Sequence, residues 1–179
     1  VTDTDLPIID LDPSDGGAIS HTTSINGAAV SLEDNENPAT ITEASNAVNN
    51  LTIQVSGLQD GKDDKIIINT TILPADGSTG NQTNITVGGV AVDIAYSGAT
   101  FTMTKNNGSA LTQSEVQAII RDIQYKNDDT SSLTTGDRTF TFGTTDSSGN
   151  SATQAVSTVT VIDTIAPIAS VGPSTARLF

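Results

Sequence analysis

The sequence predicts an all-β fold, a Greek-key β-sandwich with one short helix. Short segments that alternate apolar and polar residues, rich in Val, Ile and Thr, recur along the 179 residues, and a period of two is typical of half-buried strands. Clusters of Gly, Asn, Asp and Ser separate these segments, as turns do. A single stretch has the helical period instead, so strands and helices do not alternate as they do in α/β folds.

The expected strands of the first two thirds of the chain are short. An extended stretch, IIDLD, leads into a Pro-Ser-Asp-Gly turn. The run KIIINTTIL is the richest in β-branched residues and is expected to form one strand. Alternation predicts strands at 28–32, 39–42, 51–58, 65–73 and 100–104, and a hairpin over 84–96 that turns on Gly88-Gly89.

The stretch LTQSEVQAIIRDIQY changes to the helical period. Its apolar residues recur at i, i+3, i+4 and i+7 from Val116 to Ile123, which is the apolar stripe of a helix. Thr112, with Glu115 three residues later, has the spacing of a capping box. We therefore expect one helix of about two to three turns here.

Two antiparallel strands are expected at the end of the domain, at 138–146 and 151–163, joined by a turn at 147–150. No linker rich in Pro, Ser and Gly interrupts the chain before them. We therefore expect a single domain over residues 8–162, flanked by a junction at 1–7 and a second junction, or the start of another module, at 163–179.

The two ends of the sequence resemble each other. The first nine residues read VTDTDLPII, and residues 161–169 read VIDTIAPIA, so five positions are identical at an offset of 160. Self-similarity at a fixed period is the signature of tandem repeats. The adjacent modules of one polypeptide are therefore the expected partners.

The composition restricts the function. Twenty-one acidic residues against seven basic ones give a net charge of −14, which argues against nucleic acid and anionic membranes as partners, because phosphate contacts need Lys and Arg. No apolar run is long enough to insert into a bilayer. With no Cys and a single His, thiolate sites and zinc are excluded. Cations are the expected partners of so acidic a chain.

Catalysis is not expected. The single His21 and the absence of Cys leave little material for a nucleophilic triad. Paired carboxylates cleave glycosides in some enzymes, but sugar clefts usually present aromatic platforms, and aromatic residues are 3% of this chain, with no Trp. We expect a protein that is not an enzyme.

The stretch DLDPSDGG is the first candidate metal site. Asp10 and Asp12 project to one face of an extended backbone, and the turn that follows brings Asp15 back toward them. The junction adds Asp3 and Asp5. Clustered carboxylates without basic neighbours suit Ca²⁺, which takes 6–8 oxygen ligands in flexible geometry. The alternative is a solvated Asx-turn at a strand end.

The junctions resemble those of cadherin-type repeats, where an Asp-rich linker ending in Pro holds calcium. Asp3, Asp5 and Pro7 match this pattern at the first junction, and Asp163 and Pro167 match it at the second, where residue 165 is Ile instead of Asp.

The body of the chain, roughly residues 7–162, resembles the cadherin-like (Ig-like) repeats of large bacterial surface proteins of the RTX-adhesin kind. The most specific part is a capped short helix, then Tyr-x-Asn, then Gly-Asp-Arg-Thr-Phe-Thr, then Asp-x-x-Gly-Asn; residues 60–100 match least. The resemblance implies a secreted, extracellular β-sandwich at the bacterial cell surface, monomeric and stiffened by Ca²⁺. It also implies loop ligands at Glu43 and Asp146, although Asp146 also suits a plain hairpin turn.

Two functions remain open. The resemblance favours an extender module that calcium makes rigid at its ends and junctions. The alternative is a module that itself binds a surface glycan, peptide, protein or polymer. The length favours this alternative somewhat, because residues 8–162 exceed the ~100 residues of a minimal sandwich, with the extra length concentrated in 60–100.

Overall fold

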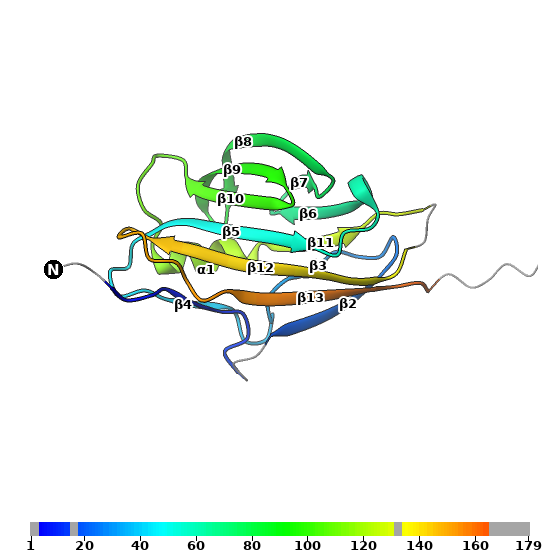
Figure 1. Ribbon diagram of the computed structural model, residues 1–179, viewed down its shortest axis with the longest axis horizontal. Coiled ribbons are helices and arrows are strands. Elements are labelled where there is room, and N and C mark those ends of the chain that lie inside the picture. The colour runs from blue at the N-terminus through cyan, green and yellow to red at the C-terminus, as the bar shows by residue number, and fades with distance from the viewer. Residues whose placement is uncertain (1–3, 15–17, 131–133, 165–179) are drawn as a thin grey trace, which may run out of the picture.

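The computed structural model describes residues 4–14, 18–130 and 134–164, which form a two-layer β-sandwich with one α-helix packed against it (Figure 1). The elements, in chain order, are β1 (Ile8–Asp10), β2 (Ile19–Ser24), β3 (Val30–Ser31), β4 (Thr40–Thr42), β5 (Val48–Ser56), the 3₁₀ turn η1 (Gly61–Asp63), β6 (Asp64–Ile68), β7 (Thr71–Pro74), β8 (Gly77–Val87), β9 (Val90–Gly98), β10 (Thr100–Lys105), α1 (Gln113–Arg121), β11 (Ile123–Asn127), β12 (Gly136–Asp146) and β13 (Ala155–Ile162).

A seven-stranded sheet, in the order β2-β13-β12-β5-β10-β9-β8, forms one layer. The other layer is the four-stranded sheet β3-β11-β6-β7, and β1 pairs with β4 alone. β12 and β13 pair with each other as a hairpin. On its other side β12 pairs with β5, and β13 pairs in parallel with β2. Such non-consecutive neighbours mark Greek-key connections. The predicted all-β Greek-key sandwich is therefore confirmed.

Alternating residues of the strands fill the space between the two sheets. In β5, Leu51, Ile53 and Val55 are at most 4% exposed, and the polar residues between them are more accessible. The rings of Tyr125 in β11 and Phe140 in β12 lie 5.3 Å apart and connect the two layers. Each fully buried apolar side chain contributes about 1.5–3 kcal/mol, so this largely aliphatic core is the main source of stability.

The helix α1 begins at the predicted capping box. The hydroxyl of Thr112 accepts a hydrogen bond from the backbone N–H of Glu115 (3.3 Å), and the Glu115 carboxylate accepts one from the Thr112 N–H (2.8 Å). The helix ends at Arg121, earlier than its apolar period predicts, because Ile123 is already the first residue of β11. Ile123 is buried in either case, so the period does not distinguish a helix from a strand there.

The prediction of one strand over 65–73 was wrong. The chain turns at Asn69 and Thr70, so β6 and β7 are an antiparallel hairpin in which Ile68 faces Thr71. Asn69 has a φ of 55°, a left-handed conformation that Asn adopts more readily than most residues. The β-branched residues on both sides of it obscured this turn. The predicted hairpin at Gly88-Gly89 is confirmed by the pairing of β8 with β9.

The described chain enters the sandwich at one end and leaves it at the other (Figure 1). We call the end where β1 begins and β12 finishes the entry end, and the end where β12 begins and β13 finishes the exit end. One hydrophobic cluster runs through the sandwich from Ile9 to Val161. That the domain begins at residue 8 and ends at residue 162 remains a prediction.

Candidate metal site at the entry end

Three segments meet at the entry end of the sandwich. The loop after β4 lies between the start of α1 and the β12–β13 turn. On one side the backbone N–H of Gln113 donates to Oδ1 of Asn46 (2.9 Å), and on the other the N–H of Ser147 donates to the carbonyl of Ala47 (3.0 Å). This loop therefore connects the helix to the turn, and it carries Glu43.

Glu43 is a buried acidic residue with one unsatisfied oxygen. Its side chain is 2% exposed, and Oε1 accepts hydrogen bonds from the N–H (3.0 Å) and the hydroxyl (2.9 Å) of Ser45. Oε2 is buried and has no hydrogen-bond partner among the described residues. A buried acceptor left unpaired costs about 1–3 kcal/mol, and more when it is charged. A bound cation would remove this cost.

Asp146 lies at the end of β12 and is fully buried. Its Oδ1 accepts from the N–H groups of Ser148 and Asn150 (2.8 Å each), and Oδ2 accepts from the Asn150 side-chain amide (2.7 Å). Burial alone would raise the pKa of Asp146, but these donors hold it below its usual value. The carboxylate is ionised and organises the hairpin turn.

Asp5 lies close to the loop that carries Glu43. It is exposed and lines a hollow of about 510 Å³ together with Ala44, the residue after Glu43. The pairing of Ile8 with Thr42 explains this placement, because the antiparallel register brings the residues before β1 beside those after β4. The structure thus brings Asp5, Glu43 and Asp146 to the same end of the molecule.

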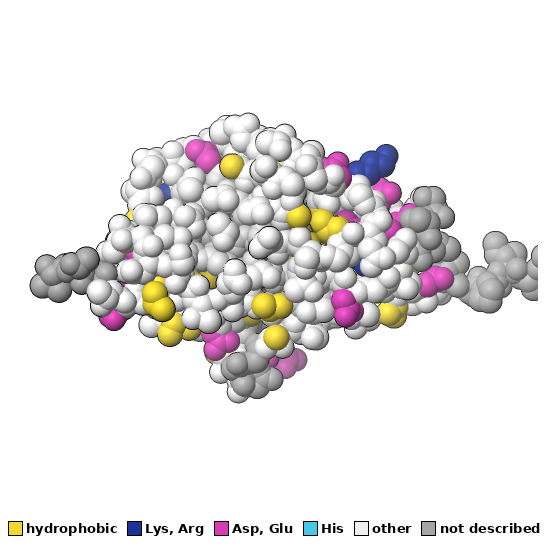
Figure 2. Space-filling view, in the orientation of Figure 1, with side chains coloured by type: hydrophobic (Ala, Val, Ile, Leu, Met, Phe, Trp, Pro, Cys, Tyr) yellow, Lys and Arg dark blue, Asp and Glu magenta, His cyan; other side chains and the backbone are white. Residues whose placement is uncertain are grey.

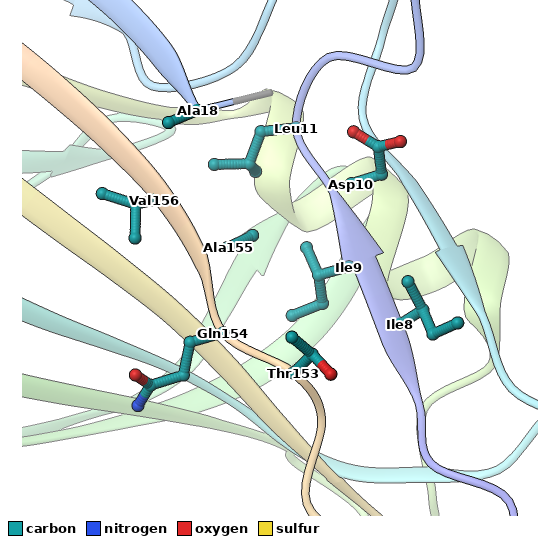
Figure 3. Close-up of a pocket in the computed structure, with 9 residues that line it drawn as sticks. All are labelled: Ile8, Ile9, Asp10, Leu11, Ala18, Thr153, Gln154, Ala155 and Val156. Atoms are coloured by element: carbon teal, nitrogen blue, oxygen red, sulfur yellow. The ribbon is translucent and has the colours of Figure 1, made fainter. Parts of the chain in front are cut away.

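Asp10 and Asp12 are engaged in local hydrogen bonds instead. Oδ1 of Asp10 accepts from the N–H of Asp12 (3.1 Å), and Oδ1 of Asp12 accepts from the N–H (3.1 Å) and hydroxyl (2.5 Å) of Ser14. Figure 3 shows Asp10 at the side of a hollow of about 320 Å³, into which Ile9 and Leu11 point toward β13. This stretch has the geometry of the Asx-turn alternative.

Of the remaining predicted ligands, one lies at the exit end and two cannot be placed. Asp163 is exposed and follows β13 at the exit end, and Asp3 and Asp15 lie outside the described residues. Within the part of the chain that the structure describes, no three acidic or His side chains are close enough to form a metal-binding group. The convergence of carboxylates around calcium therefore stays a prediction.

Sequence reasoning missed a buried ionic cluster at the exit end. Arg138 in β12 is fully buried, and its guanidinium contacts the carboxylates of Asp60 (2.8 Å) and Asp64 (3.0 Å), whose side chains are 1% and 0% exposed. The side-chain amide of Asn127 also donates to Asp60 (2.7 Å), and the Tyr125 hydroxyl donates to Asp64. The signal was present in Tyr-x-Asn and Gly-Asp-Arg, which supply three of these residues.

Comparisons with known proteins place this chain in no family. No family model matches it, and no curated protein does. Among solved structures, the CooA pilin subunit from enterotoxigenic Escherichia coli aligns over 89% of this chain and 99% of its own, at 15% identity and a TM-score of 0.34. A similarity this weak supports no inference about the fold or the function of this chain. No helix in the described part of the chain is long and apolar enough to span a bilayer.

Proposed function

We propose that this domain is a calcium-stabilised extender module of a large bacterial surface adhesin, with the calcium bound at its entry end. The observation that carries the proposal is Glu43, a buried carboxylate with an unsatisfied oxygen. Neither Glu43 nor Asp146 forms an ion pair with a Lys, Arg or His among the described residues. The adhesin context and the extracellular location rest on the resemblance of the sequence motifs.

The side chains at the entry end suit calcium better than other metals. Glu43, Asp146 and Asp5 offer hard carboxylate oxygens, and no Cys exists in the chain that would favour a softer ion. Ca²⁺ tolerates irregular geometry and completes its shell with carbonyl groups and water. In this proposal Glu43 is the central ligand, and Asp5 connects the metal to the segment that leads in from the preceding module.

The arrangement of the ends supports a role as a spacer. Because the described chain enters and leaves at opposite ends, successive modules joined through them would extend in a line. A metal that fixes Asp5 to the domain would restrict bending at the junction, since it removes conformational freedom from the linker. The proposal assigns the domain no catalytic role.

Thermal unfolding with calcium and with a chelator tests the proposal. Affinities of extracellular calcium modules are about 10⁻⁴–10⁻³ M, so 10 mM calcium stabilises the folded state by about 1.4–2.7 kcal/mol. The Glu43→Gln variant should lose this stabilisation, while Glu36→Gln, a matched change at an exposed acidic residue, should keep it. Equal unfolding midpoints of the native protein in calcium and in chelator would contradict the proposal.

A second candidate is binding of a neutral glycan to the outer face of the seven-stranded sheet. The centre of this face, over β5 and β10, shows no charged side chain in Figure 2, although the chain has a net charge of −14. A shallow hollow of about 250 Å³ lies beside it, over β8, β9 and β10, and hydroxyl residues that include Thr79, Ser97, Thr100 and Thr102 line it. Hydroxyl groups both donate and accept. A glycan array would test this candidate, and a pure spacer should bind nothing.

A further inference from the structure

The two sheets of the sandwich are connected at the exit end by one arginine. Arg138 belongs to β12 of the seven-stranded sheet, and Asp64 begins β6 of the four-stranded sheet. Nε of Arg138 donates to Oδ1 of Asp64 (3.0 Å), and an Nη donates to Oδ2 of Asp60 (2.8 Å), just before η1. The guanidinium thus bridges the two layers.

Further hydrogen-bond donors near the guanidinium hold the two aspartates in place. Oδ2 of Asp64 accepts the backbone N–H groups of Gln59 and Asp60 (3.0 Å each). Asn127 in β11 donates to both Asp60 and Asp64 (2.7 and 3.3 Å). Burying an ion pair is favourable when additional hydrogen bonds satisfy the remaining lone pairs, and this cluster fulfils that condition.

The guanidinium also organises the start of β12. Its other N–H groups donate to the carbonyls of Gly136 (3.1 Å) and Thr134 (3.4 Å). Arg138 therefore positions the chain before β12 as well as the loop before η1. This geometry needs the planar, forked donor set of Arg, because the single ammonium of Lys cannot reach all of these acceptors at once.

The exit end holds most of the positive charge of the chain. Of the seven Lys and Arg residues, four lie in η1, β6, β11 and the start of β12. Two of them, Lys65 and Lys126, both pair with Asp128, and Arg138 pairs with two further aspartates. The exit end thus neutralises Asp60, Asp64 and Asp128 with side chains of the protein itself.

We propose that Arg138 is a built-in cation that closes the two sheets at the exit end, so that this end stays closed without metal. Together with the proposed function, on which this part rests, the inference gives the module a polarised response. Removal of calcium loosens the entry end and its junction, while the exit end stays rigid. The Tyr-x-Asn and Gly-Asp-Arg motifs thereby acquire a role, because they supply the side chains of this clamp.

Amide hydrogen exchange on variants of the whole domain tests the inference. The N–H groups of Gln59 and Asp60 report on the clamp, because both donate to Asp64. In Arg138→Met, their exchange should accelerate by at least tenfold in calcium and in chelator alike. The control Arg121→Met removes the same charge from an exposed site at the end of α1 and should leave these amides unchanged.

A second, milder variant keeps the test informative if Arg138→Met fails to fold. Arg138→Lys keeps the charge and should fold, with partial loss of protection at Gln59 and Asp60. Full protection of these amides in both Arg138 variants would overturn the inference. So would a native protein whose Gln59 and Asp60 amides lose protection when calcium is removed. If calcium changes exchange nowhere while Arg138→Met opens the exit end, the calcium proposal fails and the clamp stands.

Discussion

Both ends of the sandwich bury acidic side chains, but they compensate the negative charge differently. At the exit end, Asp60 and Asp64 contact the guanidinium of Arg138. At the entry end, Glu43 and Asp146 accept hydrogen bonds from N–H and hydroxyl groups of adjacent residues, and one oxygen of Glu43 has no partner among the described residues. The exit end thus supplies its own cation, and Glu43 at the entry end is the buried carboxylate for which we propose a cation from solution.

The largest effect is expected from removing the cation of the exit end. Arg138→Met leaves two buried carboxylates without their counter-ion, which typically costs 3–5 kcal/mol. Chemical denaturation should show this loss as a lower midpoint at unchanged slope, and a domain of this size should melt about 10 °C lower. Loss below about 1 kcal/mol would show that the clamp adds little and would remove the contrast between the two ends.

Acid should weaken the same end. Burial alone would raise the pKa of Asp64, but hydrogen bonds from Tyr125, the Asp60 N–H and Arg138 hold it below its usual value. Because the pKa of Asp64 is lower in the folded state than in the unfolded state, its ionised form stabilises the fold at any pH above the unfolded pKa of about 3.9. This stability is lost as the pH falls through the folded-state pKa. Unfolding free energy should therefore fall below about pH 4, and Arg138→Met should flatten this dependence.

An intermediate effect is expected from the calcium that we propose at the entry end. Calcium at 10 mM should raise the unfolding free energy of the native protein by about 1.4–2.7 kcal/mol, and Glu43→Gln should abolish that gain. Without calcium, Glu43→Gln should be as stable as the native protein or more so, because it removes a buried charge with an unpaired oxygen. A gain that survives in Glu43→Gln would place the metal elsewhere.

The smallest expected effect is at the helix that borders the entry end. Thr112→Ala removes the N-cap of α1, which typically costs about 1 kcal/mol. Since Gln113 at the start of this helix is bonded to Asn46, the loop that carries Glu43 should loosen with it. Calcium affinity measured by calorimetry should fall. The control Gln117→Ala, at a partly exposed position of the same helix, should leave the affinity unchanged.

The strands and the helix were predictable where local pattern dictates them. β5, β10, β12 and β13 show clear alternation, and the capping box located the start of α1. β2 was missed because its sequence, ISHTTS, is mostly polar, and it owes its place to parallel pairing with β13. Local pattern does not report such long-range pairing.

The buried charged residues of the entry end were predicted from the sequence, and the arginine of the exit end was not. Glu43 and Asp146 were predicted through the resemblance of their motifs, and the structure places both at one end. Arg138 was not recognised as a buried residue, because Arg is rarely buried without a partner. Its partners lie 78 and 74 residues earlier in the chain, and only folding brings them together.

The most direct test is a calcium titration of the native protein followed residue by residue by NMR. We predict that the amide signals of Ser45, Ser148 and Asn150 shift with one common affinity, because their N–H groups bind the carboxylates of Glu43 and Asp146. Those of Gln59 and Asp60 should stay in place. Shifts at both ends, or at neither, would contradict an account in which one end takes its cation from solution and the other from Arg138.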